Sequence, residues 1–389
     1  MDMRDVLKCV LSSFFRSQRR LLLGSLFFAF FFILFSAKNV SCAPTLDEML
    51  GSMIMCGFRE ADILDSPLLP LIRDGRIGHV ILFDKDRTTG KSRNILSPLQ
   101  VKHLTKTLRE NAPSPMLIAL DQEGGRVQRL TEKRGFHSFP SARSMGQESL
   151  KKTEETAFQM GKELSDLGIN VNFAPCADVE TKENGRPSLI GQQDRSFGSD
   201  AKMVAEHVCS FGRGLLRAHV LPTLKHFPGL GCAEKDTHLS RADISQCFRV
   251  ERDLLPYVIA LDRHWPGLIM VSHASHDRLD PELPASLSRS VITHLLRENM
   301  GFYGVVISDD LQMDAIRSHF TLEESIKKAV LAGVDILLFG NNHVWDPSLP
   351  VRVHSTLRNL VEKGVIPRER IEESWMRIQA LFQSIEDFR

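Results

Sequence analysis

Short apolar runs alternate with helix-like segments along most of this chain, and this alternation constrains the fold more than any other feature. Seven such runs, each followed by polar residues, occupy residues 77–83, 116–120, 169–173, 221–224, 268–271, 304–307 and 336–339. Helical periodicity recurs between and after them, in residues 99–108, 153–167, 203–216, 291–296, 322–331 and 371–382. Alternating strands and helices indicate parallel pairing, and strands that are apolar throughout indicate a sheet buried on both faces.

We therefore expect an α/β fold, specifically a (β/α)₈ TIM-type barrel. Seven strands are one short of that count, so the eighth would be a short strand that the sequence does not separate from loop. A doubly wound open sheet is the alternative. The chain has 389 residues, which leaves enough for one barrel with insertions, and no Pro/Ser-rich linker divides its body. Residues 44–389 are therefore predicted to form one catalytic domain.

Composition excludes some classes of partner. The net charge is +1, from 49 basic and 48 acidic residues, so nothing draws the chain as a whole to nucleic acid or to an anionic membrane surface. The seven cysteines are odd in number and include no Cys-x-x-Cys pair. This spacing indicates neither a disulfide framework nor a zinc site, and we expect most of the cysteines to be buried thiols.

The N-terminus reads as a targeting segment. Residues 21–37 are almost entirely apolar and follow Arg16, Arg19 and Arg20. A positive flank before an apolar stretch is typical of a signal peptide or membrane anchor, which we assign to residues 1–43. The positive-inside rule then places the body outside the membrane, exported or anchored at the cell envelope, with this segment as its only membrane contact. A cytoplasmic protein with a buried N-terminal helix is the alternative. Cleavage near residues 41–43 and lipid attachment at Cys42 stay open.

Polar residues follow the predicted strands, and in a barrel such positions converge on one mouth. They include Asp121, the pair Lys225 and His226, and the pair Asp309 and Asp310. Aspartate is also a favoured helix N-cap, so each carboxylate taken alone has a structural explanation. His273-x-x-His276 has a spacing known from metal sites, but no third ligand is evident, and no metal is expected.

The segment from Lys225 to His238 is the richest in chemistry. Two glycines, Gly229 and Gly231, hinge it, and Asp236 lies two residues before His238. A carboxylate that orients an imidazole favours proton transfer near neutral pH. The donors Arg129, Arg195, Lys225 and His226 suit the many hydroxyls of a sugar. Lys225 also allows two further readings, a salt-bridged lysine or a Schiff-base lysine.

Four segments resemble, in order and spacing, the N-acetylglucosaminidase (β-N-acetylhexosaminidase) branch of glycoside hydrolase family 3. They are residues 121–129, 194–197, 225–238 and 308–313, within a similarity that spans about residues 45–345. Two positions depart from the family pattern. Leu230 stands where the branch usually has histidine, and Thr237 where it usually has serine. The positions that match the family's catalytic residues are intact.

The resemblance implies a (β/α)₈ barrel and a retaining enzyme that releases terminal N-acetylglucosamine from peptidoglycan fragments without a cofactor. It implies that Asp309 is the nucleophile, that His238 is the acid/base and that Asp236 pairs with His238. Asp310 would be a helix cap. The terminal sugar would be held by Asp121, Arg129, Arg195, Lys225 and His226. The second domain of many relatives is not expected after Gly340, and we expect a monomer.

Several other functions stay open from the sequence. Another family 3 β-glycosidase or a phosphorylase would use the same residues. A non-catalytic sugar-binding protein of the cell envelope, or a barrel lyase that uses Lys225, would share the fold but not the reaction.

Overall fold

Eight parallel strands form the centre of the computed structural model, which describes residues 44–183, 186–234 and 242–387. The strands pair in the order β11-β10-β9-β6-β3-β2-β1-β12. Their bounds are β1 (Ile54–Gly57), β2 (His79–Ile81), β3 (Ile118–Leu120), β6 (Val171–Asn172), β9 (Leu221–Phe227), β10 (Leu268–Val271), β11 (Val306–Ser308) and β12 (Leu337–Phe339). All eight are buried along their whole length, as expected for a sheet covered on both faces.

The two ends of this sheet meet, so the strands form a barrel. Ile307, in β11, makes a parallel bridge to Ile336, which directly precedes β12. The Ser308 amide donates to the Ile336 carbonyl at 3.1 Å, and the Ile336 amide donates to the Val306 carbonyl at 3.1 Å. The predicted TIM-type barrel is therefore confirmed, and the alternative of an open sheet is wrong.

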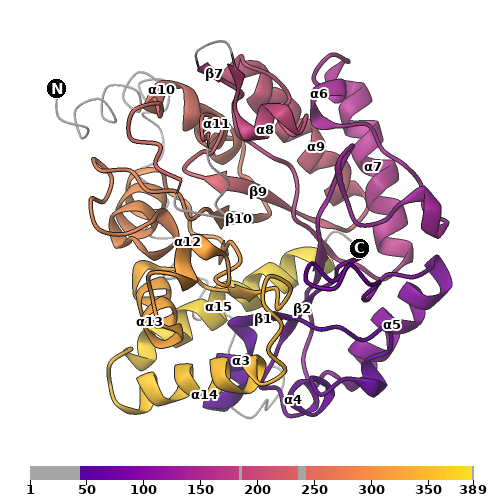
Figure 1. Ribbon diagram of the computed structural model, residues 1–389, viewed down its shortest axis with the longest axis vertical. Helices are drawn as coiled ribbons and strands as arrows, with labels where there is room; N and C mark the ends of the chain where they lie inside the picture. The colour runs from indigo at the N-terminus through magenta and orange to yellow at the C-terminus, as the bar shows by residue number, and fades with distance from the viewer. Residues whose placement is uncertain (1–43, 184–185, 235–241, 388–389) are drawn as a thin grey trace. The chain divides into compact units, whose positions relative to one another are not determined.

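Helices surround the strands (Figure 1), as the alternation in the sequence predicts. The longer ones are α5 (Pro98–Asn111), α7 (Leu150–Asp166), α9 (Ala201–Arg217), α11 (Leu255–Asp262), η4 (Ser290–Asn299, a π-helix), α13 (Leu322–Ala332), α14 (Leu349–Glu362) and α15 (Arg368–Asp387). Shorter helices are α3 (Leu46–Ser52), η1 (Ile63–Asp65), α4 (Leu69–Arg73), η2 (Glu132–Arg134), α6 (Ala142–Met145), α8 (Leu189–Gln192), α10 (Val250–Asp253), η3 (Ala285–Leu287) and α12 (Asp314–Arg317). Two hairpins, β4–β5 (Gln122–Gly124 and Val127–Gln128) and β7–β8 (Lys182–Glu183 and Arg186–Pro187), lie outside the barrel sheet.

The predicted elements are found with shifted ends. Each of the seven apolar runs overlaps a strand, and each periodic segment overlaps a helix. The strand missing from the prediction is β1, which comes before the first predicted strand and has only four residues. Strand β9 continues three residues beyond its predicted end, so Lys225 and His226 belong to the strand and not to the loop after it.

Membrane attachment stays a prediction. Among the described residues no helix is both long and apolar enough to cross a bilayer. The predicted signal peptide or anchor, residues 1–43, lies outside the described residues.

The cysteine prediction is confirmed for three residues and wrong for two. Cys56, Cys176 and Cys209 are buried free thiols. Cys232 and Cys247, however, form a disulfide across 15 positions of sequence. The sequence contained no recognisable spacing pattern for this pair. The disulfide joins the segments on either side of residues 235–241.

A buried carboxylate holds the closing side of the barrel. Asp335 is fully buried and accepts from the Val306 amide at 2.9 Å and from Arg297 at 2.7 Å. Arg377 and Ser374 of α15 donate to its other oxygen, at 3.1 and 2.8 Å. Burial raises the pKa of Asp335, but the surrounding arginines outweigh burial and lower it below its usual value. One side chain therefore ties η4, β11 and α15 together.

We expect Asp335→Asn to lower the free energy of unfolding by about 3 to 5 kcal/mol, because the buried arginines lose their counter-charge. The ionised carboxylate stabilises the fold above the unfolded-state pKa of about 3.9, and this stabilisation is lost as the pH falls through the lower folded-state pKa. Urea unfolding should therefore show the full difference at pH 7 and a shrinking one below about pH 4. Asp314→Asn is the control, because the Asp314 side chain is half-buried and its partner Arg317 is exposed. Equal effects of the two variants would contradict the role of Asp335.

The disulfide should contribute measurably to stability. For a closed loop of this length the chain-entropy model gives about 3 kcal/mol. The double variant Cys232→Ser/Cys247→Ser, and the wild type with reductant, should unfold at similarly reduced urea concentrations. Reductant should not change the double variant further. Thiol labelling of the denatured protein should reveal two additional thiols after reduction, and unchanged labelling would show that the bond is absent.

Candidate active site

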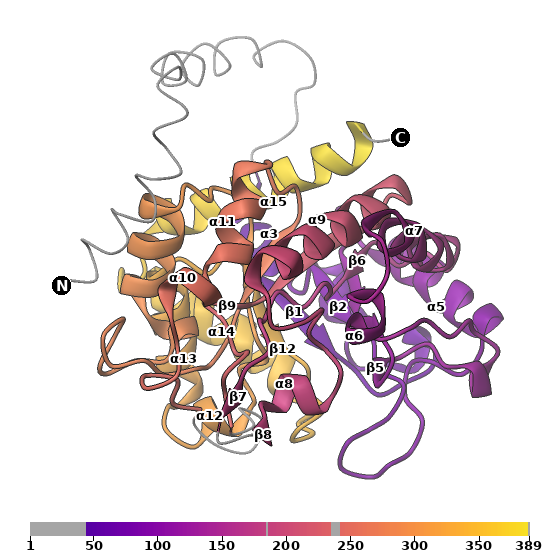
Figure 2. The ribbon, with the colours of Figure 1, turned by 90° about the horizontal axis from the view of Figure 1, so that it is seen from above.

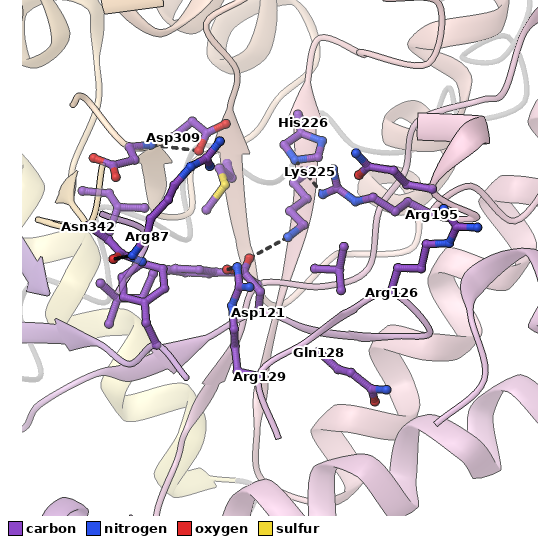
Figure 3. Close-up of a pocket in the computed structure, with 18 of the residues that line it drawn as sticks. Arg87, Asp121, Arg126, Gln128, Arg129, Arg195, Lys225, His226, Asp309 and Asn342 are labelled. Atoms are coloured by element: carbon purple, nitrogen blue, oxygen red, sulfur yellow. Dashed lines mark hydrogen bonds and ion pairs between the residues drawn. The ribbon is translucent and has the colours of Figure 1, made fainter. Parts of the chain in front are cut away.

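A cavity of about 660 Å³ opens at the carboxyl ends of the barrel strands. This volume lies within the range of small-molecule sites. Its lining includes all five residues predicted to hold a sugar and the predicted nucleophile, namely Asp121, Arg129, Arg195, Lys225, His226 and Asp309. In Figure 3, Arg87 and Asn342 lie on the Asp309 side of this cavity, and Arg126 and Arg195 lie on the other.

A tight hairpin returns Arg129 to Asp121. Strands β4 and β5 pair Gly124 with Val127. Gly124 has a φ of 91°, and a Cβ there would lie 2.1 Å from the Pro140 carbonyl oxygen, so only glycine fits. After the turn, the Arg129 guanidinium donates to the Asp121 carboxylate at 2.8 Å. Gly124 and Gly125, which both have positive φ, thus serve a tight turn, and this turn brings Arg129 to Asp121. Asp121 precedes a hairpin and caps no helix.

Five charged side chains, with Arg129 among them, form an ion-pair network at the floor of the cavity. The Lys225 ammonium lies 2.9 Å from an Asp121 oxygen and 2.7 Å from a Glu123 oxygen. Arg195 donates to both oxygens of Glu123, at 2.9 and 2.7 Å. Lys225 and Glu123 are almost fully buried, with side chains 2% and 3% exposed. Buried charges persist only when they are paired, so the network holds its members in fixed positions.

The pKa values reflect this pairing. Burial raises the pKa of Glu123, but Arg195 and Lys225 outweigh burial and lower it to about 2. Burial lowers the pKa of Lys225, yet Asp121 and Glu123 raise it above its usual value. A Schiff-base lysine requires the neutral amine and thus a lowered pKa. The structure therefore shows the salt-bridged lysine and speaks against the lyase interpretation.

His226 is oriented by a buried carboxylate. Its Nδ1 lies 2.7 Å from Asp178 Oδ2, and its Nε2 lies 3.2 Å from Arg195 Nη2. A guanidinium only donates hydrogen bonds, so Nε2 of His226 accepts from Arg195. Nδ1 therefore carries the hydrogen and donates it in a hydrogen bond to Asp178. The second oxygen of Asp178 accepts from the Leu230 amide at 2.6 Å. Leu230 thus contributes through its backbone, which the departure from histidine at this position leaves unchanged.

Cys176, Asp178 and His226 are the one group of potential metal ligands found among the described residues. Their atoms already bond one another, because the Cys176 thiol donates to Asp178 Oδ2 at 3.1 Å. Burial and then the Asp178 charge raise the pKa of Cys176 well above its usual value. A metal ligand must be the thiolate, so the cluster is built as a hydrogen-bonded triad. His273 and His276 do not converge: His273 contacts Ser286 and the Asp310 carbonyl, whereas His276 packs against Phe248.

Asp309 directly follows β11, on the cavity wall. Its amide donates to the Val271 carbonyl at 2.9 Å, and one of its carboxylate oxygens accepts from the Asp310 amide at 2.8 Å. Asp310 was predicted to cap a helix, which is wrong. It accepts from the Gln312 amide at 3.0 Å in a turn, and α12 begins only at Asp314.

Asp236 and His238, the predicted acid/base pair, lie outside the described residues. The structure also reveals lining and supporting residues for which the sequence indicated no role: Lys85, Arg87, Glu123, Asp178 and Asn342. For Lys85 and Arg87 a signal was present, since a polar stretch follows the predicted strand at 77–83. Glu123 lies within residues 121–129, one of the four segments that resemble the family, but the sequence indicated no role for it.

The chain matches the model of the glycosyl hydrolase family 3 N-terminal domain over residues 45–381. It is 33% identical over 275 residues to a β-hexosaminidase of Nitrosomonas eutropha, covering 68% of this chain and 74% of the relative. It is 32% identical to β-hexosaminidase A of Pseudoalteromonas piscicida over 87% of this chain, and spans only 61% of that relative's length.

Solved structures agree with these matches. A family 3 β-N-acetylglucosaminidase from Paenibacillus sp. str. FPU-7 superposes with a TM-score of 0.80 at 33% identity, covering 88% of this chain and 63% of that one. A β-N-acetylhexosaminidase from Beutenbergia cavernae superposes with a TM-score of 0.76 at 27% identity, covering 87% of this chain and 99% of the other. The chain is therefore a glycoside hydrolase and belongs to family 3, among relatives that are β-hexosaminidases and β-N-acetylglucosaminidases.

Proposed function

We propose that this protein is a retaining β-N-acetylglucosaminidase that removes a terminal N-acetylglucosamine residue. The observation that carries the proposal is the ion-pair network at the floor of the cavity. It presents carboxylate and guanidinium groups of Asp121, Arg129 and Arg195 in fixed positions toward a cavity of sugar size. Paired charges of this kind bind neutral hydroxyls by charge-assisted hydrogen bonds without reorganising. The names of the relatives support N-acetylglucosamine as the sugar.

The proposed reaction uses Asp309 as nucleophile. Its carboxylate attacks the anomeric carbon, and a glycosyl-enzyme forms as the bond to the leaving oxygen breaks. His238 protonates that oxygen and later accepts a proton from the attacking water, and Asp236 favours the protonated imidazole. A histidine has an unperturbed pKa of about 6.5, so it serves both steps near neutral pH. The order and spacing of the matched segments support these two assignments.

We further propose peptidoglycan fragments as the natural substrate and the cell envelope as the place of action. The family resemblance supports the substrate, and the apolar segment at residues 21–37 supports the location. Expression of a reporter fusion to residues 1–43, with assay of envelope and cytoplasmic fractions, tests the location. A reporter found only in the cytoplasm would refute it.

Asp309→Asn should lower kcat on an aryl N-acetylglucosaminide by at least about a thousandfold, because the covalent step is lost. Asp314→Asn, five residues later and half-buried at the surface, is the matched control and should retain activity. A slow fluorosugar substrate should label the peptide that contains Asp309 in the wild type, as read by mass spectrometry. A label on a different carboxylate would overturn the assignment.

Asp236→Ala should lower kcat more than it raises KM, because Asp236 acts on the chemical step through His238. Loss of the carboxylate lowers the pKa of an adjacent imidazole, so the alkaline limb of the kcat/KM profile should move to lower pH. Glu234→Ala removes an exposed carboxylate two residues away and should leave the profile unchanged. An effect on KM alone would contradict the role of Asp236.

Two rival functions are separated by the same assays. Sugar binding without turnover by the wild type would indicate a binding protein. Turnover that depends on inorganic phosphate and yields a sugar phosphate would indicate a phosphorylase.

A further inference from the structure

We propose that Lys85 and Arg87 bind an oxyanion at the outer end of the cavity, beside the sugar site. The anion is carried by the group attached to the anomeric carbon, or is supplied by a free anionic acceptor. This inference rests on the proposed function, because it places the sugar on the floor formed by Asp121, Arg129 and Lys225.

The first argument is charge balance within the cavity. At the floor, the cations Lys225 and Arg195 are paired with Asp121 and Glu123. Arg129 pairs with Asp121 at 2.8 Å. The side chains of Lys85 and Arg87 also line the cavity, yet neither forms an ion pair or hydrogen bond with any part of the chain that the structure describes. The cations of the floor are thus paired, whereas the side chains of Lys85 and Arg87 have no ion-pair partner among the described residues, although Asp84, Asp309 and Asp310 also line the cavity.

The second argument is that the loop carrying these cations is rigidly built. Residues 84–92, here called the β2 loop, follow β2. Asp86 in this loop is buried and accepts from Arg59 at 2.7 Å and from the Thr89 amide at 2.8 Å. Burial raises the pKa of Asp86, but the bonds from Arg59 and Thr89 lower it overall, so the carboxylate stays charged. The loop is therefore anchored from within by an ionised aspartate.

Asn342 fixes the same loop against the end of β12. Its side-chain oxygen accepts from the Arg87 amide at 2.9 Å, and its nitrogen donates to the Lys85 carbonyl at 3.2 Å. Asn342 is 8% exposed, so this clamp is shielded from water. The backbones of Lys85 and Arg87 are thus held while their side chains are exposed. Binding of an anion would therefore order the two side chains but not the backbone that carries them.

The third argument is direction. An enzyme that removes a terminal sugar binds its hydroxyls innermost, with the anomeric carbon at Asp309 and the leaving group outermost. In Figure 3 the Arg87 side chain extends into the cavity on the Asp309 side, away from Arg195. Atoms beyond the anomeric carbon would therefore lie near Arg87, and Lys85 of the same loop also lines the cavity. A carboxylate on the leaving group, or a phosphate that approaches the same carbon, would meet Lys85 and Arg87.

The test compares two substrates that differ in one charge, the 4-carboxyphenyl β-N-acetylglucosaminide and its methyl ester. The measured quantity is the ratio of their kcat/KM values in the wild type, in Lys85→Gln, in Arg87→Gln and in the double variant. Lys91→Gln is the matched control, since Lys91 is an exposed cation of the same loop that does not line the cavity. All side chains replaced are exposed, so thermal unfolding should be unchanged.

We expect each single variant to lower the carboxylate-to-ester ratio about fivefold, with Lys91→Gln near the wild type. The wild-type ratio should fall as salt is added, because exposed charge pairs are screened. An equal loss on both substrates would mean that Arg87 acts on Asp309 itself and would overturn the subsite. A ratio that is unchanged in the double variant would also overturn it.

A second arm identifies the source of the anion. Inorganic phosphate at matched ionic strength is added to the methyl ester. In phosphorolysis a phosphate oxygen bonds to the anomeric carbon as its bond to Asp309 breaks, the electron pair returns to Asp309, and N-acetylglucosamine 1-phosphate is released. If this product forms in the wild type and declines in the double variant, the anion is a free acceptor. If only the substrate ratio changes, the anion belongs to the leaving group.

Failure of the proposed function gives a different result. A wild type that hydrolyses neither substrate refutes the glycosidase proposal. The subsite is then measured by calorimetry with the thioglycosides of the same acid and ester. Weaker binding of the acid to the double variant, with binding of the ester unchanged, supports the subsite, and equal binding of the acid to both proteins overturns it.

Discussion

Lys225 lies between Asp121 and Glu123 with almost no exposure to water, and the site depends on this buried contact. An ammonium in such a position is stable only because two carboxylates compensate it, and those carboxylates are in turn held by Arg129 and Arg195. Removal of one member would leave a buried charge unpaired, so the floor behaves as a unit. The desolvation of these charges occurs when the protein folds, so the cavity presents hydrogen-bonding groups in fixed positions to any ligand that enters it.

Asp178 connects this floor to the segment that follows β9. One oxygen orients His226, and the other holds the Leu230 amide. The disulfide between Cys232 and Cys247 then bounds the chain on either side of residues 235–241. Asp178 therefore bonds both the end of β9 and the chain at Leu230, which follows it. The cations of the β2 loop differ from those of the floor: their side chains are exposed, and only their backbone is held, by Asn342.

Much of the fold was predictable because burial on both faces leaves a continuous apolar signature in each strand. The runs at 77–83 and 336–339 became β2 and β12. Strand β1 was missed because four residues between short helices carry no period of their own. Asp310 was misassigned because an aspartate after a strand looks the same whether a helix or a turn follows. The Cys232–Cys247 bond was missed because two cysteines pair only when the folded chain brings them close together, which their spacing in sequence does not show.

The sequence by itself determined the alternation of buried strands and helices and the polar residues at the strand ends, and it named Asp121, Arg129, Arg195, Lys225, His226 and Asp309 as candidates for the site. These residues can be recognised in the sequence because their side-chain chemistry and their spacing are local properties of the chain. The tertiary structure decided which charges compensate one another. Contacts with residues far away in sequence define the roles of Glu123 and Asp178, and the cavity that such residues form defines the position of Lys85 and Arg87. Electrostatic energy depends on distance and burial, and the fold alone sets both.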